Sequence, residues 1–70
     1  MKPDEIIPGR TYEIRRLGAG SFYAKVISVD AREREAIIQW ETLLNGEWLQ
    51  QSGRVNATMI IRLRSGEAIQ

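Results

Sequence analysis

The chain has 70 residues, 43% of them hydrophobic and 27% charged, and its ten Lys and Arg against nine Asp and Glu leave a net charge of +1. This composition predicts one small folded domain rather than a disordered segment. Neither Cys nor His is present, which excludes disulfides, thiol or imidazole catalysis and zinc sites built on those side chains.

The first predicted strand follows a turn. Residues 1–8 are expected to form a flexible lead that ends at Pro8–Gly9. Pro fixes φ there and Gly accepts a positive φ, so the dipeptide predicts a turn. From Thr11 to Leu17 apolar and polar residues alternate. This period of two predicts a strand with Tyr12 and Ile14 on one face.

The next two strands are predicted on either side of a charged turn. A glycine-rich break precedes Phe22–Asp30, a run rich in β-branched and aromatic residues that favours a strand. The sequence AREREA is too short to nucleate a helix between β-like flanks, so we interpret it as a hairpin connection. The third strand is predicted over Ala36–Leu44, with Ile38 and Trp40 on one face.

The last third of the chain contains a strong hairpin signal. Asn45–Gly46 suits a type I′ turn, which needs positive φ at both central residues, and predicts a fourth strand over Glu47–Gln51. Another turn is predicted at Ser52–Arg54. A short helical piece is expected over Val55–Met59 and a final strand over Ile60–Arg64.

Five short strands with tight turns and one helical turn before the last strand predict an all-β domain. Such a domain is a small, strongly bent sheet that closes on itself. We expect the domain to span residues 9–64, and residues 65–70 to form a flexible tail.

This arrangement resembles an SH3-like barrel, and the stretch GSFYAKVISVDAREREAIIQWE is most similar to a Tudor domain. The similarity consists of a Gly before an aromatic pair, a Tyr followed by Ala, a strand ending in SVD, a charged turn and an aliphatic run ending in Trp. The stretch VNATMIIRL takes the place of that family's short helical turn and last strand. The resemblance covers Pro8 to Leu63 and implies a five-stranded barrel.

Tudor domains that bind methylated Arg or Lys surround the cation with about four aromatic side chains. The resemblance places Tyr23 and Trp40 on two of these cage positions, while the other two fall near Leu17 and Leu43. Trp48 would join the cage only by leaning in from across the predicted hairpin. The alternative is that these rings cover the core or an oligomer interface.

The first and last strands of an SH3-like barrel tend to lie side by side, which would gather four arginines: Arg15, Arg16, Arg62 and Arg64. Arg10 would lie at the rim. Next to an exposed ring such as Tyr23 or Trp40, this strip would follow a phosphate backbone while a base stacks on the ring. The alternative is a solvated strand face that discourages edge-to-edge aggregation.

No catalytic constellation stands out. The carboxylates lie mostly in or beside predicted turns, and LGAGS is neither a complete dinucleotide motif nor followed by a helix. GAGSFYAKVIS and VNATMIIRL are similar to parts of the plasmid-borne dihydrofolate reductases, in which four small barrels share one pore. The Val-Gln-Ile-Tyr motif that lines that pore is replaced here by WLQQSGRV, which argues against the reductase activity.

We therefore expect a non-catalytic binding module that recognises a protein or nucleic-acid partner through one barrel face, without cofactor or metal. The partner-binding residues predicted for it are Tyr23, Trp40, Trp48, Arg15, Arg16, Arg62 and Arg64. A self-associating structural homo-oligomer is the alternative, because a domain this small has a thin core. The charged, proline-containing start and the lack of a stretch of about 20 apolar residues predict a cytoplasmic protein with no membrane association.

Overall fold

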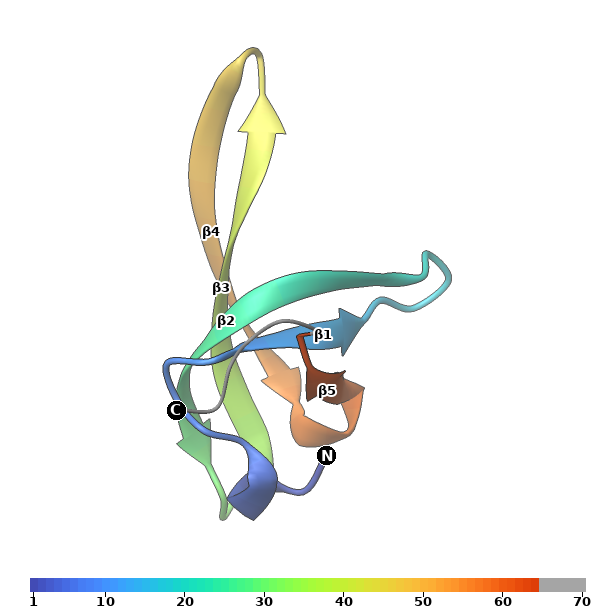
Figure 1. Cartoon of the computed structure of the whole chain (residues 1–70), viewed down its shortest axis with the longest axis vertical. Helices are drawn as coiled ribbons and strands as arrows, with labels where there is room; N and C mark the ends of the chain where they lie inside the picture. Colours follow the sequence, from blue (N-terminus) through green and yellow to red (C-terminus); the bar gives the residue numbers. More distant parts are fainter. Residues whose placement is uncertain (65–70) are drawn as a thin grey trace.

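The computed structural model describes residues 1–64 and forms one antiparallel sheet of five strands in the order β4-β3-β2-β1-β5 (Figure 1). The strands are β1 (Thr11–Arg15), β2 (Ser21–Asp30), β3 (Glu35–Leu44), β4 (Glu47–Asn56) and β5 (Ile60–Leu63). Two single 3₁₀ turns, η1 (Pro3–Glu5) and η2 (Ala57–Met59), precede β1 and β5. The predicted all-β class, the five strands and the helical turn before the last strand are confirmed.

The sheet is strongly bent but open. β4 and β5 lie at its two edges and do not pair with each other, so the predicted closure into a barrel is not seen among residues 1–64. The predicted tail, residues 65–70, lies outside the described residues. No helix in the described part of the chain is long and apolar enough to span a membrane.

The turn predictions at two sites are confirmed by the backbone. Asn45 and Gly46 have φ values of 52° and 80°, as a type I′ turn requires, and Gly9 has a φ of 94°. A two-residue turn fixes the register of the hairpin, which places Leu43 opposite Trp48.

The predicted turn at Ser52–Arg54 is wrong, because β4 continues through it to Asn56. Gly53 lies opposite Ile38 in an unbroken ladder with β3. A glycine in a Ser-Gly pair is typical of turns, but in this strand the absence of a side chain makes space for the Trp40 ring. A Cβ atom at Gly53 would lie 3.3 Å from Cη2 of Trp40. The small residue therefore serves packing within a strand.

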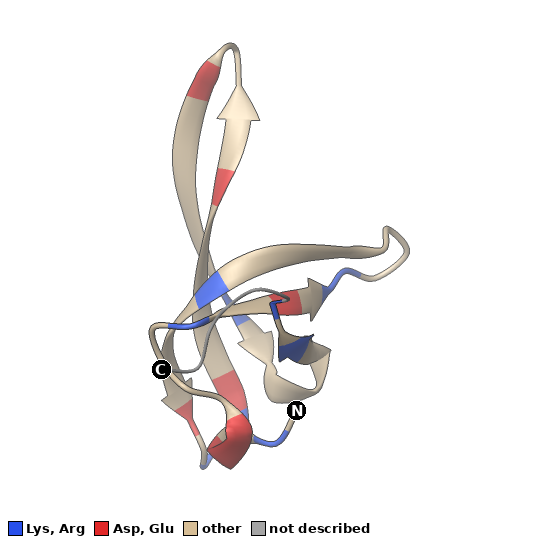
Figure 2. Ribbon diagram, in the orientation of Figure 1, with Lys and Arg blue, Asp and Glu red and all other residues tan. Residues whose placement is uncertain are grey.

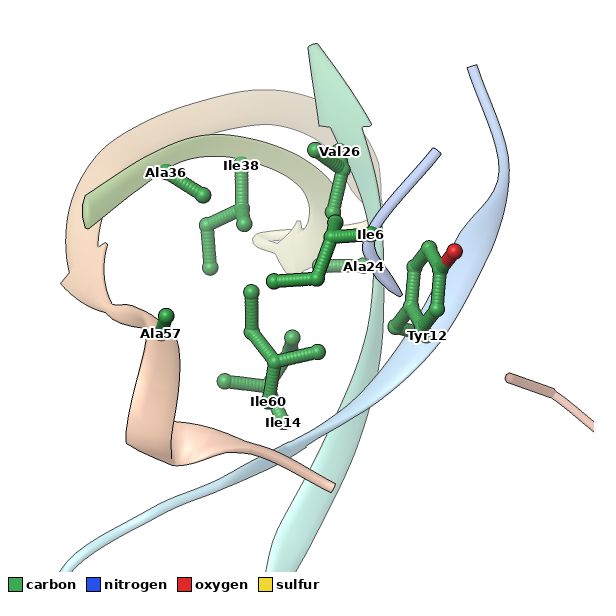
Figure 3. Packing of buried hydrophobic residues seen from close by; sticks show 9 residues of the cluster. All are labelled: Ile6, Tyr12, Ile14, Ala24, Val26, Ala36, Ile38, Ala57 and Ile60. Carbon is green, nitrogen blue, oxygen red and sulfur yellow. The ribbon is translucent and has the colours of Figure 1, made fainter. Parts of the chain in front are cut away.

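The core lies inside the bend of the sheet and is drawn from every strand except β4 (Figure 3). Its nine buried residues are Ile6, Tyr12, Ile14, Ala24, Val26, Ala36, Ile38, Ala57 and Ile60. The predicted alternation is confirmed in β1, where Tyr12 and Ile14 are buried, and in β3, where Ile38 is buried and Trp40 packs against the core.

One core residue lies outside the predicted domain, and the burial of another follows from a β-bulge. Ile6 lies in the segment that we expected to precede the domain, and the amide of Ile7 donates to the hydroxyl of Tyr12 at 2.9 Å. In β5, Ile60 is buried while Ile61 is exposed, because the β1–β5 register shifts between Glu13 and Ile14. Such a bulge moves side chains to the other face, which the sequence pattern does not predict.

Candidate functional site

The outer face of β2, β1 and β5, on the side away from the core, carries a row of polar and aromatic side chains. Glu13 of β1 lies opposite Tyr23 of β2 on one side and opposite Arg62 of β5 on the other. The predicted adjacency of the first and last strands is thus seen. Tyr23 is 50% exposed at one end of this row.

One basic side chain contacts the Tyr23 ring, and three others share its face of the sheet. The guanidinium carbon of Arg64 lies 5.3 Å from the ring centroid, within the range of a cation–π contact. Two more cations lie on this face because side chains alternate along a strand. Arg15 is two residues after Glu13 in β1, and Lys25 is two residues after Tyr23 in β2. We call this surface the basic face; its members are Glu13, Arg15, Tyr23, Lys25, Arg62 and Arg64.

Glu13 holds the basic face together. Its two carboxylate oxygens accept separate hydrogen bonds, from Oγ of Ser21 at 2.6 Å and from Nε of Arg62 at 2.7 Å. These bonds, first that from Ser21 and then that from Arg62, lower the pKa of Glu13 below its usual value. The carboxylate is therefore ionised at neutral pH and offsets one of the four cations on this face.

Not all of the predicted strip lies together. Arg15 and Arg16 are consecutive in the chain, and the guanidinium carbon of Arg16 lies 4.6 Å from the ring centroid of Phe22. Phe22 in turn meets Trp40 edge-on, with centroids 5.4 Å apart. This cluster packs against the core on the inner side of the sheet. Arg16 and Trp40 are thus separated from the basic face.

The two rings matched to cage positions lie on opposite faces of the sheet. Tyr23 shares its face with Glu13, whereas Trp40 extends the core face through Ile38. They therefore do not face one another as in an aromatic cage. Arg10, which we expected at the rim, immediately precedes β1, and its carbonyl accepts a bond from the amide of Val26 at 3.0 Å.

Trp48 lies far from both groups, on the outer part of the β3–β4 hairpin. This part, residues 41–52, projects beyond the rest of the molecule (Figure 1), and every one of its side chains is exposed. We call it the arm. Trp48 is 67% exposed there. The segment 35–53, which includes the arm, carries three Glu and no Lys or Arg, and Figure 2 shows only acidic positions along the projecting ribbon.

Two hollows of the described surface lie away from the basic face, and the smaller, of about 220 Å³, has four polar residues in its lining: Ser28, Asp30, Glu35 and Arg54. The larger of the two, of about 410 Å³, lies between η1, the β2–β3 turn and η2, and five of its nine lining residues are polar: Lys2, Asp4, Arg34, Asn56 and Thr58. Among residues 1–64, no group of three or more Asp and Glu is arranged to hold a metal ion.

No protein-family model matches this chain, and neither the curated proteins nor the solved structures that were searched include a match. The function must therefore be inferred from the basic face and the arm. Sequence reasoning missed Glu13 and Lys25 as members of the basic face. Their spacing of two from Arg15 and Tyr23 is the signal that would have found them.

Proposed function

We propose that the protein is a non-catalytic module that binds single-stranded nucleic acid through the basic face. The observation that carries this proposal is the position of Tyr23, a half-exposed ring in cation–π contact with Arg64 on a sheet face that also carries Lys25 and Arg62. Arg15 adds a fourth cation at the end of β1.

The chemistry of single strands suits this arrangement. Cations follow the phosphate backbone, while exposed aromatic rings stack with unpaired bases. A duplex offers no free base face to Tyr23, so the ring favours single strands. Arg62 is already bonded to Glu13, so it contributes less charge to a ligand than Arg64 does. The low net charge of +1 is not an obstacle, because the acidic residues of the arm lie apart from this face.

We also propose that the fold is an SH3-like one, similar to Tudor domains. This proposal is supported by the antiparallel pairing of β1 with β5, by η2 immediately before β5 and by a core enclosed in the bend of the sheet. We do not propose that the protein binds methylated Arg or Lys, because Tyr23 and Trp40 lie on opposite faces of the sheet and cannot form an aromatic cage.

Fluorescence anisotropy with labelled oligonucleotides tests the proposal. We expect binding to single-stranded DNA and RNA that is tighter than to matched duplexes and that weakens as salt increases. Tyr23→Ala removes a stacking contact and should weaken binding about fivefold or more. Arg64→Gln should lower the salt slope by about 0.7, the contribution of one phosphate contact on a single strand.

Arg32→Gln is the matched control. Arg32 lies in the turn between β2 and β3, outside the basic face, and its loss removes the same charge. It should leave the affinity nearly unchanged. An absence of binding at low salt, or an equal loss in Arg32→Gln and Arg64→Gln, would contradict the proposal. The first result would show that no nucleic acid is bound, and the second that binding is non-specific attraction to the whole domain.

A further inference from the structure

The outer edge of β4 has no strand partner among the described residues. Exposed edges invite pairing with another chain, and proteins usually protect them with charges, prolines, bulges or short strands. β4 has ten residues, its ladder with β3 has no bulge, and Trp48–Gly53 contains neither a charge nor a proline. The opposite edge strand, β5, has four residues and carries Arg62. β4 is therefore the less protected edge.

The backbone of β4 is oriented for such pairing. In a hairpin with a two-residue turn, the residues that flank the turn bond to each other, and alternate residues along each strand then point their amides outward. Leu44 and Glu47 flank the turn here. The outward-pointing amides of β4 consequently belong to the even-numbered residues: Trp48, Gln50, Ser52 and Arg54.

The arm also exposes apolar side chains on both of its faces. Leu43 and Trp48 lie opposite each other on one face, and Leu44 and Leu49 lie on the other. These four side chains are between 36% and 67% exposed, whereas the core contains only nine residues. An apolar surface of this kind on so small a domain indicates an interaction site.

We infer that β4 pairs with β4 of a second copy of this chain, giving a two-fold symmetric dimer with one continuous ten-stranded sheet. The β4 sequence is self-complementary when the two strands run antiparallel around Gln51. Gln50 then lies opposite the partner's Ser52, and Trp48 opposite the partner's Arg54. Each contact occurs twice, as two-fold symmetry requires.

This register pairs chemically suited groups. The ring of Trp48 would gain a cation–π contact with the partner's Arg54. Within residues 1–64 the only ion pair of Arg54 is a 3.6 Å surface contact with Glu35, which is weak enough to be given up. Leu49 would lie opposite the partner's Gly53, beside the ring of the partner's Trp40. The exposed apolar side chains of one arm would thus be covered in part by the other. The inference uses residues outside the basic face, so it does not depend on nucleic-acid binding.

Sedimentation equilibrium of the full chain at several concentrations tests this inference. We expect a monomer–dimer equilibrium with no larger species, because the two-fold pairing occupies the β4 edge of both copies and leaves only the short, charged β5 edges open. Gln50→Pro removes an outward-pointing amide while preserving the bonds to β3, since proline is tolerated on the free side of an edge strand. It should raise the dimer dissociation constant at least about tenfold, as expected for residues at the centre of an interface.

Gln50→Lys is a second edge variant, and Ala19→Lys is its control. Both add one positive charge at an exposed position, but Ala19 lies in the β1–β2 turn, away from the arm. Gln50→Lys should weaken the dimer and Ala19→Lys should not. Gln50→Lys also replaces Gln50→Pro if circular dichroism shows that the proline variant is unfolded.

Hydrogen exchange gives an independent readout. The amides of Gln50 and Ser52 should exchange more slowly in the dimer than in the monomer, whereas those exposed in the β1–β2 turn should not change. A strict monomer at every concentration would overturn the inference. So would a dimer that Gln50→Lys and Ala19→Lys weaken equally, or assembly into larger, open-ended species.

Discussion

Glu13 on β1 and Arg62 on β5 connect two strands that are far apart in the sequence. Nε of Arg62 donates to Oε1 of Glu13 at 2.7 Å, across a separation of 49 residues. The side chain of Glu13 is only 17% exposed, and Ser21 of β2 donates to its other oxygen. One carboxylate therefore bonds side chains from both neighbouring strands, and its ionisation should affect the stability of this end of the sheet.

Glu13 should make the stability of the protein depend on pH. Its pKa in the folded state lies below the usual value of 4.5, because Ser21 and Arg62 bond to the ionised form. The unfolded chain then binds more protons between the two pKa values, so the free energy of unfolding rises with pH in that interval. The contribution is fully present above about pH 4.5 and is lost as the pH falls through the folded pKa.

Urea unfolding at a series of pH values measures this effect. Wild type should lose stability below about pH 4.5, and Glu13→Gln should be less stable at pH 7 and lose less on acidification. The other carboxylates contribute equally to both proteins, so the difference between the two curves isolates Glu13. Parallel curves would show that the bonds to Ser21 and Arg62 do not persist in solution.

Tyr12→Phe should destabilise the protein by about 1–2 kcal/mol, because the amide of Ile7 would lose its bond to a buried hydroxyl. Tyr12 is 1% exposed, so water cannot easily replace the lost oxygen. Tyr23→Phe removes a hydroxyl from a half-exposed ring and is the matched control, with an expected change below about 0.5 kcal/mol. Denaturant unfolding compares the two, and faster exchange of the Ile7 amide would locate the effect in the lead segment.

The sequence predicts most of the sheet because local signals there agree with the tertiary structure. Asn45–Gly46 both favours and adopts the positive φ values of its turn. Alternation in β1 and β3 correctly predicts which of their residues face the core, because a side-chain period of two follows directly from strand geometry. The prediction fails at Gly53, where a residue typical of turns is required by the Trp40 ring.

The site is harder to predict than the strands because it depends on register. Whether Tyr23 and Trp40 share a face is decided by the pairing of β2 with β3, which includes a shift between Val26 and Ser28. Arg15 and Arg16 are adjacent in the chain and so point to opposite faces of a regular strand. The prediction that Arg15 and Arg16 share one strip was therefore avoidable from the sequence alone. The position of the bulge between Val26 and Ser28 was not.

Gly53→Val should destabilise the protein by about 1–3 kcal/mol through overpacking. Even the Cβ atom would lie 3.3 Å from Trp40, and the two further methyl groups must displace the ring or the strand. Phe22 meets the same ring edge-on, which limits how far it can move. Denaturant unfolding at low protein concentration, where self-association is weak, measures the change.

Gly53→Ala is expected to be close to neutral. The single methyl group is tight against Trp40, but alanine also restricts the unfolded chain, which offsets part of the strain. Ser52→Val is the control for a valine in this strand, because Ser52 is exposed and lies opposite Gln39 on the other face. Equal stability of Gly53→Val and wild type would mean that Trp40 does not rest on Gly53.

Glu13→Gln should have opposite effects on stability and on nucleic-acid binding. The substitution removes the one negative charge on the basic face and replaces the ionised acceptor that holds Arg62 by a neutral amide oxygen, which holds the guanidinium more weakly. Both changes favour a phosphate ligand, so the affinity for a single-stranded oligonucleotide at neutral pH should rise by about threefold or more. Anisotropy at fixed salt measures it, and Glu33→Gln, in the β2–β3 turn outside this face, is the matched control. A gain in both variants would indicate net charge as the cause, whereas weaker binding in Glu13→Gln alone would mean that Glu13 orients Arg62 for the ligand instead of competing with it.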